Sequence, residues 1–181
     1  MLFERWGEIV RGNRNEIALR DLAGKRSWTF EELDCAAEKD GPAESPFCFP
    51  HGNSAEFVLT VVRGWRIGRV VCPLEPEQAP PEIGRKLPSG IVHLKTTSAS
   101  TGVPRLVAFT SSQLMADARN IVSTMGLRPE WPNLGVISLA HSYGFSNLVL
   151  PLLLHGIPLI LTGSSLPEAV RRAAGEERHL T

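Results

Sequence analysis

Hydrophobic residues recur along this chain in two alternating spacings, which predict helices and strands in turn. Leu2, Phe3, Trp6, Ile9 and Val10 fall on one face of a helix. Segments with the same helical spacing are 30–41, 54–68, 111–126, 145–154 and a last helix opening at 165–168. Short apolar runs typical of strands are 47–49, 70–74, 91–94, 106–109, 134–139 and 157–161. This order predicts an α/β fold: a largely parallel sheet with helices on both faces.

Local signals place several of the boundaries. The alternating residues 17–29, with a turn at Ala23-Gly24-Lys25, predict a small hairpin. Thr29 and Glu32 form a capping box that opens a helix. Ser54 is a suitable N-cap, and Gly68 closes the helix that follows it. The side chains expected to point inward from that helix are Phe57, Val58, Val61, Val62 and Trp65. Those expected to do so from the helix ending at Gly126 are Leu114, Met115, Ala118, Ile121, Val122 and Met125.

A proline-rich stretch interrupts the pattern at 75–89. Four prolines in this stretch can neither continue a helix nor serve in a central strand. We therefore expect a surface connector here, with one short helix at 82–87. The whole chain, 1–181, is predicted to form a single α/β domain.

Composition excludes several classes of protein. Nineteen basic and nineteen acidic residues leave no net charge, which argues against a nucleic-acid surface. Cys35, Cys48 and Cys72 are odd in number and lack metal-ligand spacing, so we expect no zinc site and a reducing, cytoplasmic location. The first residues do not form a signal peptide, and the apolar stretch 148–161 is too short and too interrupted to cross a bilayer.

The most polar stretch, 96–107, lies between two predicted strands. Five of its first six residues carry hydroxyl groups, and a Gly, a Pro and Arg105 follow. Hydroxyls and backbone N–H groups beside a cation suit phosphate. The stretch has neither the Walker A spacing nor the dinucleotide fingerprint. Taken alone, it also fits an ordinary polar loop, because Ser and Thr favour turns.

A second polar group follows the predicted strand 134–139. That strand delivers His141 to the carboxyl edge of the sheet, where open α/β sheets bind ligands. Tyr143, Ser146 and Asn147 either border a substrate pocket or pack in the core. The alternative role for His141 is a helix cap or a core side chain. His51, His93 and His155 are interpreted as structural.

These motifs resemble the adenylate-forming superfamily, which includes acyl-CoA synthetases, adenylation domains and luciferases. The phosphate loop of that superfamily runs Thr-Ser-Gly-Ser/Thr-Thr-Gly-x-Pro-Lys-Gly-Val. The matching positions are Thr97, Ser98, Ser100, Thr101, Gly102, Pro104 and Val107, whereas Ala99, Arg105 and Leu106 depart. Residues 139–144 resemble the next motif, in which His is followed by two residues and Gly. Residues 20–21 and 28–33 resemble the start of the same domain.

The resemblance implies an AMP-forming carboxylate–CoA ligase. In such an enzyme a small-molecule carboxylate attacks the α-phosphorus of ATP, with Mg²⁺, and the resulting acyl-adenylate passes to a thiol, here expected to be coenzyme A. The loop residues that would bind the phosphates are Thr97, Ser98, Ala99, Ser100, Thr101, Gly102 and Arg105. His141 would position the substrate as the catalytic residue, and no residue is assigned to a metal.

The same resemblance covers only the front portion of these enzymes. The downstream adenine, Mg²⁺ and ribose motifs and the C-terminal domain with its catalytic Lys have no counterpart in these residues. We therefore expect a fragment that is catalytically incomplete alone and that self-associates through surface left uncovered. The alternative is a degenerate remnant that acts as an anion-binding or interaction module. An unrelated phosphate binder is disfavoured by the His141 motif.

Overall fold

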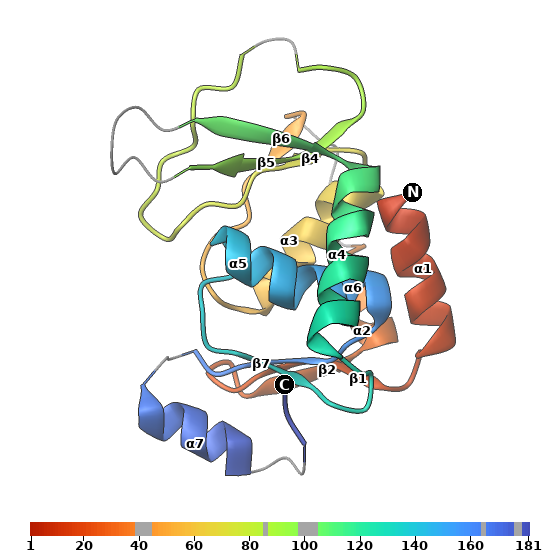
Figure 1. The fold of residues 1–181 in the computed structure, drawn as a ribbon, viewed down its shortest axis with the longest axis vertical. Helices are drawn as coiled ribbons and strands as arrows, with labels where there is room; N and C mark the ends of the chain where they lie inside the picture. Colours follow the sequence, from red (N-terminus) through yellow and green to blue (C-terminus); the bar gives the residue numbers. More distant parts are fainter. Residues whose placement is uncertain (39–44, 85–86, 98–104, 164–165, 176–178) are drawn as a thin grey trace.

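Two sheets enclose a layer of helices in the computed structural model of this chain (Figure 1). The structure describes residues 1–38, 45–84, 87–97, 105–163, 166–175 and 179–181. Strands β4, β5 and β6 lie at one end of the view and β1, β2 and β7 at the other, with α3, α4 and α6 between them. The predicted α/β class is confirmed.

The first sheet has the strand order β2-β1-β8-β7. Its members are β1 (Ile17–Asp21), β2 (Arg26–Thr29), β7 (Asn133–Gly135) and β8 (Leu159–Leu161). The predicted hairpin is the antiparallel pair β1–β2, while β8 runs parallel to both β1 and β7.

The second sheet has the order β3-β4-β5-β6. Its members are β3 (Phe47–Cys48), β4 (Val70–Val71), β5 (Ile91–Thr96) and β6 (Leu106–Thr110). The first three are parallel, but β5 and β6 are antiparallel because no helix separates them in the chain. Among the described strands, four of the six pairings are parallel, and the strands form two sheets where one was expected.

The helices owe their positions to their apolar faces. They are α1 (Leu2–Gly12), α2 (Phe30–Ala36), α3 (Ala55–Arg66), α4 (Ser111–Met125), α5 (Ser142–Gly144), α6 (Leu150–His155) and α7 (Pro167–Gly175). All five inward side chains predicted for α3 are buried, because this helix packs against both sheets. The capping box at Thr29 and the left-handed Gly126 that ends α4 are both present.

The helix predicted over 145–154 begins earlier and is irregular. It starts with α5 at Ser142, continues through a π-helical segment, η1 (Phe145–Val149), and ends as α6. Pro151 has no N–H to donate to the carbonyl of Asn147 four residues back. The side chain of Asn133 donates to that carbonyl instead, at 3.1 Å. Proline therefore explains one missing helical bond in this region.

Three further features differ from expectation: the length of a strand, the absence of a short helix and the width of a buried helix face. The strand predicted over 134–139 is only the short β7, and the described residues of 82–87 are not helical. The inward face of α4 is narrower than predicted: Leu114 and Ala118 are buried, but Met125 is 45% exposed. Periodicity identifies an apolar face without showing how much of it the rest of the fold covers.

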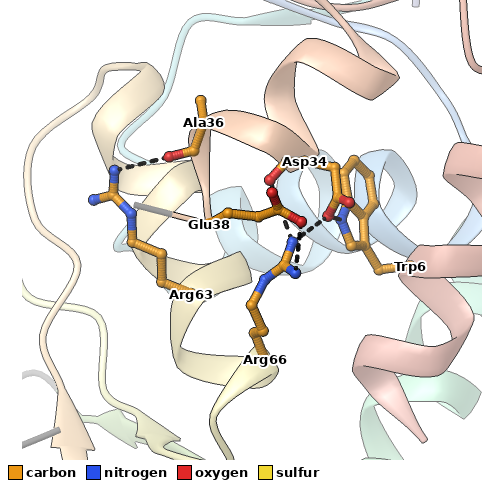
Figure 2. Close-up of polar contacts among 6 residues, drawn as sticks. All are labelled: Trp6, Asp34, Ala36, Glu38, Arg63 and Arg66. Atoms are coloured by element: carbon orange, nitrogen blue, oxygen red, sulfur yellow. Dashed lines mark hydrogen bonds and ion pairs between the residues drawn. The ribbon is translucent and has the colours of Figure 1, made fainter. Parts of the chain in front are cut away.

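A polar network joins the first three helices (Figure 2). The carboxylate of Asp34 on α2 accepts hydrogen bonds from Trp6 Nε1 at 2.7 Å and Arg66 Nη2 at 2.8 Å. Arg66 Nη1 also reaches Glu38 at 3.3 Å. Trp6 itself is fully buried, so this network fixes α1 and α3 against α2 away from the predicted site.

Candidate functional site

The hydroxyl-rich loop leaves the second sheet between β5 and β6. Two hydrogen bonds close its base: Thr97 N donates to Arg105 O at 2.9 Å, and Arg105 N donates to Thr97 Oγ1 at 3.0 Å. The Arg105 side chain is exposed, and among the described residues its guanidinium has no partner. The predicted residues Ser98, Ala99, Ser100, Thr101 and Gly102 lie outside the described residues.

His141 forms the N-cap of α5. Its Nδ1 accepts a hydrogen bond from the backbone N–H of Tyr143 at 3.2 Å. In the neutral ring the proton then resides on Nε2, which is a donor. The imidazole is exposed, and among the described residues only Nδ1 has a partner, so Nε2 is available to a ligand. The cap role and the ligand role are therefore compatible.

Gly144 allows this first helical turn to pack closely. A Cβ at this position would lie 1.9 Å from the carbonyl oxygen of Ser138, a distance that backbone atoms cannot relieve. The spacing of His, two residues and Gly is thus a packing requirement, because it brings the start of α5 against the chain that precedes it.

The connector residues hold the two predicted motifs in place. Gln78 Nε2 donates to Thr96 Oγ1 at 3.1 Å, next to the hydroxyl-rich loop. Ser138 Oγ donates to Glu75 Oε2 at 2.7 Å, just before His141. Asn53 accepts from the backbone of Leu139 at 3.2 Å. Sequence reasoning missed Asn53, Glu75 and Gln78, since these bonds join segments far apart in the chain.

A hollow of about 450 Å³ opens between β5, β6, α4 and the start of the α5–η1 helix. Its lining includes Lys95, Phe109, Asp117, Ile121, Tyr143 and Ser146. Tyr143 is 57% exposed, so it borders the hollow instead of packing in the core. Asn147 lines the hollow too.

Another hollow, of about 490 Å³, lies at the amino ends of β1 and β8 and includes Glu16, Arg20 and Pro158. None of the predicted site residues that the structure describes lines it. The hollow beside Lys95 is lined by Tyr143, Ser146 and Asn147 but not by His141 or Arg105. Ligands in open α/β sheets bind outside the carboxyl ends of strands, so the hollow beside Lys95, which lies at the carboxyl end of β5, is the better candidate.

Three polar side chains form a chain along the wall of the candidate hollow. Lys95 Nζ donates to Ser146 Oγ at 3.0 Å, and Ser146 Oγ donates to Asp117 Oδ2 at 2.7 Å. Burial lowers the pKa of Lys95, while Asp117 opposes that shift. These contacts connect the strand before the loop, the helix after it and the helix that His141 caps.

His93 lies two residues before Lys95 on β5 and is fully buried. Its ring centroid is 4.3 Å from that of Phe145, and neither ring nitrogen has a hydrogen-bond partner among the described residues. Burial, together with the nearby charge of Lys95, lowers its pKa to about 3. His93 is therefore neutral and structural.

Comparison with known proteins gives a consistent result. A 2-hydroxy-7-methoxy-5-methyl-1-naphthoate–CoA ligase from Streptomyces carzinostaticus is 33% identical over 119 residues, which cover 61% of this chain and 21% of the relative. The solved structure of o-succinylbenzoate CoA synthetase (MenE) from Bacillus subtilis with its acyl-adenylate intermediate matches 95% of this chain with a TM-score of 0.77 at 16% identity. The chain has the fold of the adenylate-forming superfamily. No protein-family model matches it.

The resemblance to the superfamily seen in the motifs is confirmed, and the match covers part of each relative. ATP-bound MatB from Rhodopseudomonas palustris aligns with 96% of this chain at a TM-score of 0.79 and 11% identity. The chain spans 59% of that MenE structure and 47% of MatB. MenE has also been solved with ATP and a magnesium ion, and with AMP.

Two kinds of feature are absent from the described residues. None of the helices they contain has the length and apolar character that crossing a membrane needs. They also contain no group of three or more His, Cys, Asp or Glu side chains arranged to hold a metal ion.

Proposed function

We propose that this chain is the N-terminal part of an AMP-forming carboxylate–CoA ligase. A substrate carboxylate attacks the α-phosphorus of ATP and expels pyrophosphate, after which the thiol of coenzyme A displaces AMP to form the thioester. The observation that carries this proposal is that the strand leading to the hydroxyl-rich loop and the helix capped by His141 meet at one hollow through Lys95 and Ser146.

The described groups fit a nucleotide and a carboxylate. Thr97 and Arg105 hold the ends of the loop together, and the Arg105 guanidinium, which has no partner among the described residues, would contact phosphate. The loop residues Ser98, Ala99, Ser100, Thr101 and Gly102 would supply hydroxyl and backbone donors. His141 Nε2 would donate to an oxygen of the carboxylate or the α-phosphate, which lowers the repulsion between two anions. Mg²⁺, bound with ATP, would offset the remaining charge.

The relatives suggest the class of acid. The curated relative is named for a hydroxylated naphthoate, and MenE for o-succinylbenzoate. Phe109, Ile121 and Tyr143 form an apolar and aromatic part of the wall of the hollow. We therefore assign an aromatic carboxylate as substrate. The free thiols of Cys35, Cys48 and Cys72 are the basis for proposing a cytoplasmic location for the enzyme.

A second candidate function is a remnant that binds anions without catalysis. Three departures favour it: Ala99, Arg105 and Leu106 replace Gly, Lys and Gly of the family pattern. If the family glycine uses a positive φ, Ala99 costs on the order of 1 kcal/mol there.

Titration of the chain with ATP and Mg²⁺ in a calorimeter distinguishes the two functions. We expect measurable binding, a gain of about fivefold in Ala99→Gly, and weaker binding in Arg105→Gln. Arg171→Gln is the matched control, because Arg171 is exposed on α7. Equal affinity for ATP and inorganic phosphate in all variants would favour the remnant. If residues 1–181 alone catalysed ATP-dependent pyrophosphate exchange, the expectation that they are catalytically incomplete would be contradicted.

Two substitutions at His141 separate its roles, with adenylation measured in a chain that includes the downstream motifs. His141→Asn keeps a capping acceptor but has no equivalent of Nε2, whereas His141→Ala removes both. We expect His141→Ala to lower stability by about 1 kcal/mol and His141→Asn to lower it little. Both should reduce adenylation by about 10²-fold or more. If His141→Asn left adenylation unchanged, His141 would act only as the N-cap of α5 and not in positioning the substrate.

A further inference from the structure

The Lys95–Ser146–Asp117 chain leaves hydrogen-bonding capacity at both of its ends. The Lys95 ammonium carries three N–H donors, and Ser146 takes one of them. Asp117 accepts from Ser146 at Oδ2, and within the described residues no group donates to Oδ1. Lys95 and Asp117 both line the hollow. A ligand there meets a donor and an acceptor side by side.

The two charges are held apart by the hydroxyl between them. Among the described residues Lys95 and Asp117 form no direct ion pair. Each charged group can therefore still form a hydrogen bond with a ligand. Their sum is zero, which gives little net attraction for an added anion. A ligand carboxylate would meet Lys95 favourably but Asp117 unfavourably.

The remaining wall of the hollow has an apolar and aromatic part, formed by Phe109, Ile121 and Tyr143, and a polar part, formed by Gln113, Ser142 and Asn147. Lys95 Nζ lies 5.2 Å from the ring centroid of Phe109 and 5.9 Å from that of Phe145. Phe109, Ile121 and Tyr143 line the space beside it. Such a wall suits the face of a planar ring, with the polar pair at its edge.

We propose that Lys95 and Asp117 determine substrate specificity by binding a hydroxyl group on the ring of an aromatic carboxylate. The hydroxyl oxygen accepts from Lys95 while its hydrogen is donated to Asp117 Oδ1. A hydroxyl satisfies both ends, whereas a methyl satisfies neither and a carboxylate only one. This inference rests on the proposed function and narrows its substrate to hydroxylated aromatic acids.

Binding of simple probes to the chain tests this assignment. The probes are 1-naphthoate, its singly hydroxylated isomers and a naphthalene dicarboxylate, each titrated by calorimetry. We expect at least one hydroxylated isomer to bind the wild-type chain about tenfold more tightly than 1-naphthoate. The ratio of the affinity for the hydroxylated isomer to the affinity for 1-naphthoate should fall to about one in Lys95→Met, whose side chain is of similar length. In Asp117→Asn this ratio should lie between one and the wild-type value. Lys25→Met, in the exposed β1–β2 turn, should leave it unchanged.

The outcomes separate this inference from the proposed function. Circular dichroism shows whether each variant is folded; if Lys95→Met is not, Asp117→Asn decides. Equal affinity for all probes, preference for the dicarboxylate, or a hydroxyl preference that survives both substitutions would each overturn the role of the pair. Absence of any probe binding would overturn it as well. ATP binding, measured on the same samples, reports on the proposed function independently, since neither side chain belongs to the hydroxyl-rich loop.

Discussion

Two clusters of polar side chains in this fold differ in how far their charges are matched. Between α1, α2 and α3, Asp34 accepts directly from both Trp6 and Arg66, and Arg66 extends to Glu38 (Figure 2). Beside the hollow, the hydroxyl of Ser146 lies between Lys95 and Asp117 and is hydrogen-bonded to both. In the first cluster the Asp34 carboxylate is matched by two protein donors, whereas the second cluster keeps a donor and an acceptor at an opening.

This difference indicates that the first cluster serves stability and the second serves ligand binding. A matched network between helices contributes to stability, because every partner removed leaves a desolvated group behind. A partly matched pair at an opening contributes little to stability and keeps its interactions for a ligand. Both regions hold buried nitrogens without a hydrogen-bond partner among the described residues: the two ring nitrogens of His93 beside the hollow, and Arg66 Nε in the first cluster.

The largest loss of stability is expected from Asp34→Ala. This change removes the only acceptor that Trp6 Nε1 has among the described residues and leaves Arg66 Nη2 with the Asp34 carbonyl alone, at 3.3 Å, which should cost about 3 kcal/mol of unfolding free energy. Urea denaturation at pH 7 measures it. Glu38→Ala is the matched control: the Glu38 side chain is 57% exposed, so its ion pair is worth under about 0.5 kcal/mol. Equal losses in the two variants would show that Asp34 is not the centre of this network.

The elements of the fold followed from local patterns in the sequence. The apolar spacing of Phe57, Val61 and Trp65 identified α3, and the capping box at Thr29 located the start of α2. The division of the strands between two sheets could not be predicted, because pairing such as that of β1 with β8 joins residues that are distant in sequence. The π-helical segment was missed for a related reason: the carbonyl left free by Pro151 is satisfied by Asn133.

In the candidate site, too, some residues could be predicted from local sequence patterns and others could not. His141 was found from a motif with fixed spacing, and the structure adds that it caps α5. Lys95 and Asp117 carry no motif of their own. Lys95 could be interpreted only as a polar residue of a strand, and Asp117 as one of a helix, until folding placed Ser146 between them. Contacts between distant segments are what the sequence alone leaves open.

A pH-dependent difference in stability is expected from His93→Leu. Folding lowers the pKa of His93 from 6.5 to about 3, so the folded protein binds fewer protons than the unfolded chain between these values. The stability that neutral His93 retains above pH 6.5 is lost as the pH falls through this window, by about 2 kcal/mol at pH 5. Leucine does not titrate and should abolish that part of the loss.

Unfolding of wild type and His93→Leu at pH 7 and pH 5 measures this effect. The comparison must be a difference between proteins, since burial also lowers the pKa of His155 and adds an acid-dependent loss to both. At pH 7 the variant should already be slightly more stable, because two unpartnered nitrogens are removed from the core. An equal loss in both proteins between pH 7 and pH 5 would show that His93 is not the source.

The smallest effect, and the one that most directly contrasts the two regions, is expected from Lys95→Met. Burial lowers the pKa of Lys95, so at neutral pH the folded state holds a charge that it solvates less well than the unfolded chain does. Wild-type stability should therefore rise with pH as Lys95 loses its proton, between its lowered pKa and 10.5. The variant lacks this rise and should gain under about 1 kcal/mol at pH 7, net of the lost bond to Ser146. Urea denaturation at pH 7 and pH 10 tests both points. A loss as large as that of Asp34→Ala would place Lys95 among the stabilising contacts and remove the contrast between the two clusters.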